Sequence, residues 1–360
     1  MNAKRAVSSP FPPIRSPYRK TSGTFSGQDT LMINCTNNKS PLPFVLHRRY
    51  TMKSLASWLL PILLFLSTSQ FTQTYAWNRA THMVTGAIAY RELQTTSPQI
   101  TARLVAILRQ HPEFQQRWAS KLNDPALSDD DRNQYLFMLA ARWPDDVRGN
   151  AYDHPTWHYI NYIYAPEQGM ARTDTTLATG ENILQAFEQN RLILRSNAPD
   201  SVKAIALCWL FHLTGDAHQP LHASALVDKQ FPEGDRGGNL FKIKVMMSSQ
   251  TINLHSFWDG MLLGADDFQS VRNLAVQIRQ SDPRNQLPPF GNRTITDWSK
   301  ESFQFAQDNV YRSNTLQPGS DQEGAVLPAD YVATVKPIAQ RQVALAGYRL
   351  ADELIADLGK

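Results

Sequence analysis

From Trp77 onward, apolar side chains recur mostly with the three-to-four-residue spacing of an α-helix. Residues that favour helix starts agree with this spacing, because Ser97 precedes Pro98 and Ser128 precedes an acidic turn. The pattern predicts an all-α, mainly helical single domain. Its helical segments are expected near 79–94, 98–110, 129–142, 179–196, 200–218, 265–279, 294–313 and 329–358.

One region departs from the helical spacing. Apolar and basic residues alternate over 240–245, a Ser-Ser-Gln run follows, and 251–254 can return alongside the first segment. Alternation with a period of two indicates a strand whose two faces differ. The sequence therefore predicts one small β-hairpin within the helical domain.

A leader precedes this domain. A short basic start at Met52 is followed by an apolar run of about a dozen residues and a polar stretch ending at Ala76. This layout predicts a signal peptide over 52–76 and a domain over 77–360, so the protein is expected to be secreted or periplasmic. The run contains Pro61 and is shorter than the roughly 20 residues that span a bilayer, which makes an uncleaved anchor the weaker alternative.

Residues 1–51 are rich in Ser, Pro and Asn and have no periodic pattern, so we expect a disordered or spurious extension. Residues 1–76 hold nine of the 36 Lys and Arg and one of the 32 Asp and Glu, which leaves 27 basic and 31 acidic residues downstream. The domain is therefore net −4, although the whole chain is net +4. This balance excludes a strongly basic nucleic-acid-binding face on the domain.

Cysteine usage removes one source of stability. Cys35 lies in the extension, and Cys208 alone remains from Trp77 onward, so an exported domain would have no internal disulfide. His and Asp residues at helical spacings raise the alternative of crosslinks through metal ions.

The densest such segment is HLTGDAHQPLH. His212 and Asp216 are four residues apart on a predicted helix, so both side chains project from one face and can bind one cation. Pro220 ends that helix and lets His222 turn back toward the same region. His218 points about 200° away from Asp216, which favours a role behind a ligand or on the surface.

His255 and Asp259 repeat the four-residue spacing just after the predicted hairpin. A single pair of this kind is usually a local hydrogen bond or a helix cap. Together with Asp145 in RWPDDVRG and His158 in HPTWHYIN, however, the pairs indicate a metal cluster. Imidazole and carboxylate are ligand types that suit zinc.

Six motifs follow one another along the chain in the order WNRATH, WPDDVR, WHYIN, HLTGDAHQPLH, GDRGGN and NLHSFWD. In these motifs the chain from Trp77 to its last helix resembles the zinc-dependent, single-strand-specific nucleases of fungi, plants and bacteria, within the phospholipase C and nuclease superfamily. The resemblance implies a mainly helical, phospholipase C/nuclease-like fold.

The resemblance also implies three Zn²⁺ per chain. In that family an N-terminal Trp binds zinc through its free amine and its carbonyl, which gives the predicted cleavage before Trp77 a chemical meaning. Ions bound only in the folded state would stabilise a domain that lacks disulfides. One zinc would be bound by Asp145, His158, His212 and Asp216, a second by Trp77, His82 and a bridging Asp216, and the third by His222, His255 and Asp259.

The implied activity is endonuclease cleavage of single-stranded DNA and RNA to 5′-phosphate products, with 3′-nucleotidase activity as a further expectation. Asp145 and Arg148 match catalytic residues of the family, and Arg148 matches its phosphate contact. Tyr159 matches the aromatic on which a base stacks, and Asn161 stands where the family often has an Asp. The expected partners are single-stranded nucleic acids and nucleotides, bound by a monomer with no stable protein partner.

Two alternatives remain open. A zinc phospholipase C is disfavoured because His82 follows Trp77 by only five residues, Asp259 replaces a Glu, and Tyr159 offers a base platform. A non-catalytic, exported zinc-binding protein would have closed four-ligand sites. Nine ligands shared by three ions leave open positions, which favours an enzyme.

Overall fold

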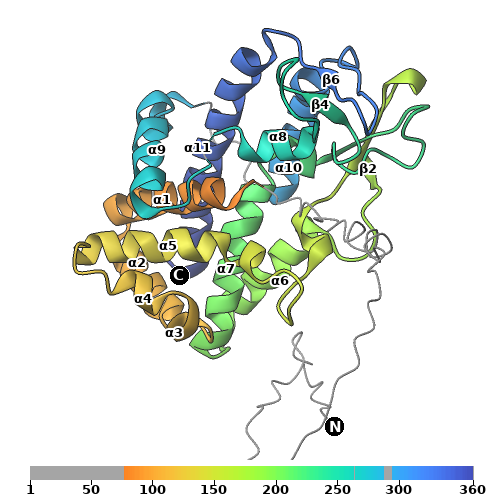
Figure 1. Ribbon diagram of the computed structural model, residues 1–360. Coiled ribbons are helices and arrows are strands. Elements are labelled where there is room, and N and C mark those ends of the chain that lie inside the picture. Colours follow the sequence, from red (N-terminus) through yellow and green to blue (C-terminus); the bar gives the residue numbers. More distant parts are fainter. Residues whose placement is uncertain (1–76, 263, 288–293, 360) are drawn as a thin grey trace, which may run out of the picture. The chain divides into compact units, whose positions relative to one another are not determined.

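The computed structural model describes residues 77–262, 264–287 and 294–359. The predicted extension over 1–51 and the predicted signal peptide over 52–76 lie outside the described residues. Within them, helices dominate and the strands are short (Figure 1), which confirms the mainly helical class. None of the described helices is long and apolar enough to cross a membrane.

The helices follow the predicted segments closely, with a few short additions. Besides the α-helices, the described part of the chain contains four short 3₁₀ turns and one π-helical turn. These are η1 (Pro155–His158), η2 (Pro166–Gln168), η3 (Pro220–His222), η4 (Arg284–Gln286) and the π-turn η5 (Ala306–Val310). The α-helices are α1 (Arg79–Thr96), α2 (Pro98–Leu108), α3 (Phe114–Arg117), α4 (Ala119–Leu122), α5 (Asp129–Asp146), α6 (Ile183–Arg195), α7 (Asp200–Asp216), α8 (Leu254–Gly260), α9 (Phe268–Ser281), α10 (Ile295–Phe305) and α11 (Tyr331–Leu358).

Helix α5 is longer than predicted. Ser128 forms a capping box at its start, as the acidic first turn indicated, but the helix continues through Pro144 to Asp146 instead of ending at 142. An ion pair of 2.9 Å between Arg142 Nε and Asp146 Oδ2, one turn apart, supports this last turn. The extension places Asp145 on a helix.

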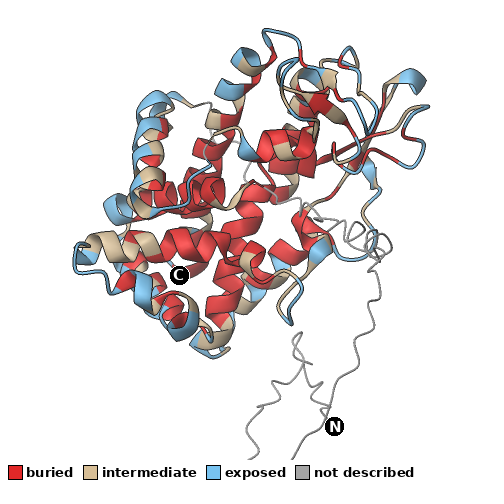
Figure 2. Cartoon of the chain, viewed as in Figure 1, coloured by how far each residue is buried: buried red, intermediate tan, exposed pale blue. Residues whose placement is uncertain are grey.

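The core is built around α1 and α7. Helix α7 packs against α2, α5, α6 and α11, while α1 packs against α5, α9 and α11. Figure 2 shows buried residues concentrated along these helices, with exposed residues on the outer faces of the others. Every residue of α7 from Lys203 to Asp216 is buried, as expected for a helix surrounded by other helices. Polar residues at its C-terminal end are therefore held in a water-poor interior.

The prediction of a single hairpin was too simple, because the described residues form two three-stranded sheets, ordered β2-β1-β3 and β5-β4-β6. The predicted hairpin is confirmed as the antiparallel pair β4–β5, and β6 adds to it in parallel. The other strands were missed because runs of two to seven residues give little periodic signal. The strands are β1 (Tyr162–Ala165), β2 (Met170–Thr176), β3 (Ser224–Leu226), β4 (Lys242–Lys244), β5 (Ile252–Asn253) and β6 (Ala325–Val326).

The parallel pairing of β1 with β3 aligns two segments that are far apart in sequence. Tyr162 pairs with Ser224, so the turns that precede these strands, η1 and η3, end next to each other. Ile160 N donates to His222 O at 2.9 Å, which continues the contact beyond the strands. This small sheet thus brings His158 and His222 together.

Candidate metal centre and adjoining pocket

Helix α7 presents two polar side chains at its buried end. His212 and Asp216 have no exposed surface, and His212 Nε2 lies 3.2 Å from Asp216 Oδ2, as the four-residue spacing predicted. Gly215 lies between them in sequence, and a Cβ atom there would come within 2.8 Å of His82 Nδ1. The absence of a side chain at Gly215 therefore allows His82 to approach α7.

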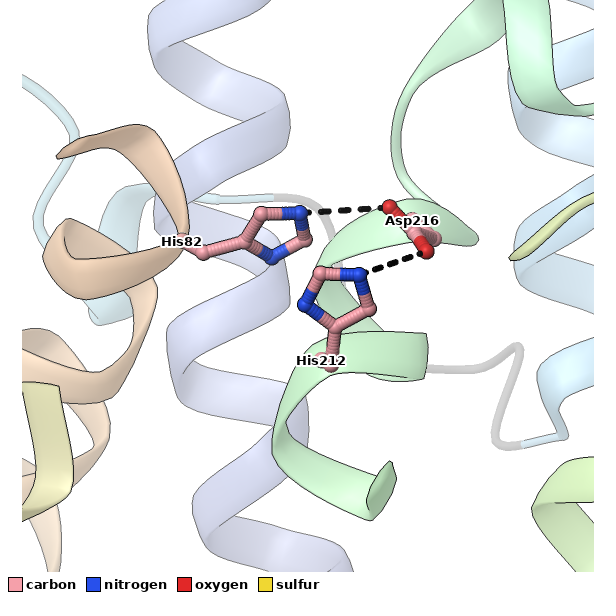
Figure 3. Close-up of side chains that lie close together, drawn as sticks. All are labelled: His82, His212 and Asp216. Atoms are coloured by element: carbon pink, nitrogen blue, oxygen red, sulfur yellow. Dashed lines mark ion pairs between the residues drawn. The ribbon is translucent and has the colours of Figure 1, made fainter. Parts of the chain in front are cut away.

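His82 reaches this position from the first turns of α1. Its Nε2 lies 3.3 Å from Asp216 Oδ1, and its ring stacks on His212 with a centroid distance of 3.7 Å. Figure 3 shows the Asp216 carboxylate facing both imidazoles, one oxygen toward each. Asp216 therefore lies between two imidazoles that were predicted to bind different ions.

The segment before His82 is also docked at this place. Trp77 is fully buried, and its indole Nε1 donates to Gly215 O at 3.0 Å. The next residue, Asn78, donates its backbone N–H to Asp259 O at 3.1 Å and caps α1 with its side chain. The backbone of Trp77 is thus held between α7 and α8, close to His82.

Asp145 and His158 complete the same cluster from α5 and η1. His158 Nδ1 lies 3.0 Å from both Asp216 Oδ2 and His212 Nε2. Asp145 Oδ1 lies 3.8 Å from His212 Nε2 and accepts two hydrogen bonds from Arg148, at 3.0 Å from Nε and 2.8 Å from Nη2. Arg148 is therefore not a surface ion pair but a partner of a buried carboxylate.

A further group lies beside this cluster. His255 and Asp259 project from α8 with His255 Nε2 and Asp259 Oδ2 3.4 Å apart, and His222 of η3 stacks on His255 at a centroid distance of 5.0 Å. His222 Nδ1 is 3.5 Å from Asp216 Oδ1, which links this group to the cluster. Gln219, which the sequence did not single out, donates Nε2 to Asp259 Oδ1 at 2.8 Å.

The predicted His and Asp side chains therefore converge in three groups. In each group the potential ligand atoms lie within 4.8 Å of one another, and every member is buried. His212 belongs to two groups, whereas the sequence assigned it to one zinc only. The groups are His82, His212 and Asp216; Asp145, His158 and His212; and His222, His255 and Asp259.

The hydrogen bonds of these histidines fit cation binding. His212, His222 and His255 each direct Nδ1 at a backbone carbonyl: Ala141 O at 2.9 Å, His158 O at 2.6 Å and Gly237 O at 2.6 Å, respectively. A carbonyl can only accept, so Nδ1 carries the proton and Nε2 keeps a free lone pair.

Buried polar atoms without hydrogen-bond partners also fit cation binding. Four of them are Asp145 Oδ2, His158 Nε2, His222 Nε2 and Asp259 Oδ2. Leaving such atoms unpaired in a protein interior is costly. A divalent cation in each group would satisfy these atoms with ligand types that suit it.

Two aspartates of the site, Asp216 and Asp259, differ in pKa. Burial alone would raise the pKa of Asp216, but the nearby imidazoles, chiefly His212 and then His222, outweigh it and hold that pKa well below its usual range. Burial raises the pKa of Asp259 well above its usual range, since only Gln219 donates to it and the negative charges of Asp145 and Asp216 add to the effect. A cation near Asp259 would supply the positive charge that this carboxylate lacks.

A pocket of about 500 Å³ opens beside His255. Tyr159 and Asn161, both predicted to contact substrate, line it. Asn161 has a positive φ of 54°, an uncommon conformation for a residue other than glycine. The other lining residues are Leu177, Thr179, Leu221, Ala225, Glu233, Arg236 and Asn239.

His218 lies outside the three groups and is fully buried, so the surface alternative for it was wrong. Its Nδ1 donates to Thr214 O at 2.7 Å, and its Nε2 lies 2.8 Å from Arg349 Nη1. Sequence reasoning also missed Gln219 and the 234–238 loop. The GDRGGN motif, with its three glycines, was the available signal for that loop.

Comparison with known proteins agrees with this geometry. A family model described as S1/P1 Nuclease matches residues 77–358. Endonuclease 4 of Arabidopsis thaliana is 26% identical over 245 residues, covering 59% of this chain and 74% of the relative. Endonuclease 3 of the same plant is 25% identical over 234 residues, 59% of this chain and 73% of the relative. Nuclease S1 of Aspergillus oryzae is 26% identical over 240 residues, 62% of this chain and 79% of the relative.

Proposed function

The chain belongs to the S1/P1 nuclease family and is a nuclease, a hydrolase of phosphodiester bonds, and from this premise we propose that its metal is zinc, with three ions per chain. The proposed substrates are single-stranded DNA and RNA, cut internally to leave 5′-phosphates, with 3′-nucleotides as smaller substrates. The convergence of three buried His/Asp groups is the observation that supports this proposal most strongly.

Within the proposal, three ions are bound, and their ligand sets are those that the family resemblance implies. The first set joins Asp145 and His158 to the α7 pair His212 and Asp216. The second joins Asp216 to His82 and to the amine and carbonyl of Trp77, and the third consists of His222, His255 and Asp259. The two oxygens of Asp216 face His82 and His212, which the proposal assigns to different ions, and this supports the sharing of Asp216 between two ions.

The bound ions would supply Lewis acidity and lower the pKa of water, so that a nucleophile is available near neutral pH. The protein's own residues would orient the reactants. Arg148 engages Asp145 Oδ1 and leaves Oδ2 for the ion, so Asp145 would hold the ion and orient the attacking water. The guanidinium of Arg148 would contact the scissile phosphate through charge-assisted hydrogen bonds.

The pocket beside His255 would hold a nucleobase next to the reacting phosphate. Tyr159 offers a ring for stacking, which accepts any base and requires an unpaired one. Asn161 can both donate to and accept from a base edge through its amide. A preference for single strands follows, because a base within a duplex is not available to the pocket.

The test is an assay of purified protein that begins at Trp77 and has measured zinc content. Single-stranded DNA and RNA should be cut faster than a duplex of the same sequence, and the products should carry 5′-phosphates. A chelator should abolish activity and lower the melting temperature together, and zinc should restore both. Cleavage by protein shown to be free of metal would overturn the proposal.

We also propose that the protein is exported and cleaved between Ala76 and Trp77. An α-amine locked in a peptide bond cannot bind metal, so a chain extended by one residue before Trp77 should bind fewer ions and be weakly active. A removable tag that leaves Trp77 first after proteolysis provides the control, and activity should return on removal. Full metal content and activity in the extended chain would contradict the assignment of Trp77.

A further inference from the structure

We propose that Arg236 is a phosphate-binding residue for the single-stranded substrate, presented at the pocket by a loop that buried Asp235 holds in place. This inference rests on the proposed function, in which a base occupies the same pocket. It assigns a role to Arg236 of the GDRGGN motif, a residue that is neither a proposed metal ligand nor part of the base platform.

Arg236 lines the pocket together with Tyr159, Asn161 and His255. The residue is exposed, and its guanidinium makes no hydrogen bond or ion pair with any residue that the structure describes. Arg148, by contrast, is paired with Asp145. Arg236 therefore offers the pocket a cation whose hydrogen-bonding capacity is not already used by the protein.

The backbone at Arg236 is held in a conformation that side chains rarely adopt. Its φ is +57°, and the only other residue with a positive φ, glycine excepted, that lines this pocket is Asn161 at +54°. Within the described residues, the remaining non-glycine cases are three consecutive residues, 312–314, in a single turn. Such conformations are costly and persist where the surroundings impose them, often at binding sites.

Asp235, the residue before Arg236, anchors the loop to the interior of the protein. Its carboxylate is fully buried, where Oδ1 accepts from Leu226 N at 3.0 Å and Oδ2 accepts from the Tyr311 hydroxyl at 2.7 Å. Its backbone N–H also donates to Leu226 O at 2.9 Å. The loop is thereby fixed to β3 and to the region of η5.

The other side of Arg236 is fixed as well. At Gly237, a Cβ atom would lie 2.4 Å from Leu221 O, so only glycine fits against η3. Gly237 O accepts from His255 Nδ1 at 2.6 Å. Arg236 therefore lies between two anchored residues, one of which also orients a proposed metal ligand.

The chemistry favours a phosphate as the group bound by Arg236. Guanidinium matches a phosphodiester with two parallel hydrogen bonds, and a strand with one base on Tyr159 brings its neighbouring phosphates to the pocket rim. The domain is net −4 from Trp77 onward, so an unpaired cation at this rim offsets repulsion of the substrate.

The decisive variant is Arg236→Gly, because glycine accepts the positive φ without strain and removes only the side chain. On a single-stranded oligonucleotide, KM should rise about tenfold with kcat nearly unchanged, as expected for one lost charge-assisted contact. The logarithmic salt dependence of kcat/KM should weaken by about 0.7, the value for one phosphate contact on a single strand. Arg236→Lys should retain the salt slope.

Lys229→Ala is the matched control. It removes one positive charge from the same connection between β3 and β4, but Lys229 is 91% exposed and does not line the pocket. Its KM and salt slope should equal those of the wild type, and all variants should keep the wild-type metal content.

The inference fails if Arg236→Gly, with full metal content, keeps the wild-type KM and salt slope, or if Lys229→Ala shows the same losses. Failure of the proposed function has a different signature, because the wild-type protein itself would then not cleave single strands. A loss of metal in Arg236→Gly would also overturn the inference, since the residue would then act on the metal site and not on substrate.

Discussion

The metal groups and the adjoining pocket are built in different ways. Most of the metal-site side chains come from α1, α5, α7 and α8, and all are buried. The pocket rim comes from loops and short turns, and two of its polar residues, Asn161 and Arg236, have positive φ angles. Under the proposed function, the helices would hold the reacting centre and the loops would select the substrate.

The largest effect expected from this division is at Asp216. Asp216→Asn should remove a carboxylate shared by two ions and lower kcat/KM by on the order of 10³-fold, whereas Asp259→Asn affects one ion and should cost less. Metal analysis and kinetics of both purified variants provide the measurement. Equal losses in metal and turnover would break the bridging role assigned to Asp216.

The next effect concerns a residue that touches a ligand without being one. Gln219→Met should leave Asp259 Oδ1 without its donor and Leu221 N without its acceptor, contacts that now measure 2.8 and 2.6 Å. Metal affinity should fall about 10- to 100-fold for one ion only, because the other two groups lie on α1, α5, α7 and η1. A titration that shows uniform weakening of all bound metal would contradict the separation of the groups.

On the pocket side, Tyr159→Ala should weaken binding of single strands by about 1 to 3 kcal/mol with unchanged metal content. The loss should appear in KM and not in kcat, which distinguishes the pocket from the metal groups. Tyr159→Phe keeps the ring and should behave as the wild type. If kcat falls and metal is lost in the alanine variant, Tyr159 supports the cluster and the comparison drawn above is wrong.

The smallest expected effect lies outside both regions. Burial, with a smaller contribution from Arg117, lowers the pKa of His111 to about 3. Between pH 6.5 and 3 only the unfolded chain takes up a proton there, so unfolding free energy falls as pH falls and is unaffected above 6.5.

Replacing His111 with a residue that does not titrate should therefore favour stability only at acidic pH. Between pH 7 and pH 5, the free energy of unfolding of His111→Gln should fall by about 1 to 2 kcal/mol less than that of the wild type. Denaturant unfolding at both pH values measures this difference, with kcat/KM at pH 7 as the control. Parallel pH dependence of the two proteins would show that His111 is not a buried neutral histidine.

The sequence could predict the site residues that lie on helices but few of those that lie on loops. The spacing of His212 with Asp216, and of His255 with Asp259, is set by the helix itself and is visible in one segment at a time. Arg236 is different, because its place depends on Asp235 and on the close packing of Gly237 against Leu221.

Long-range pairing was equally hidden from the sequence. His158 and His222 meet because β1 and β3 are parallel neighbours, and neither strand is long enough to be recognised on its own. The family resemblance assigned His158 and His222 to two different ions of one cluster, but the strand pairing that brings them together became visible only in three dimensions.

The docking of Trp77 also constrains the order of events during folding. Its indole bonds to Gly215 O, 138 positions later in the chain, and Asn78 bonds to Asp259 O, later still. Helix α1 packs as well on α11, the last helix of all. Contacts between distant parts of a chain form slowly, because a long loop must close before they contribute any stability. The part of the domain that leaves the ribosome first can therefore complete its native contacts only after the last described helix has been made.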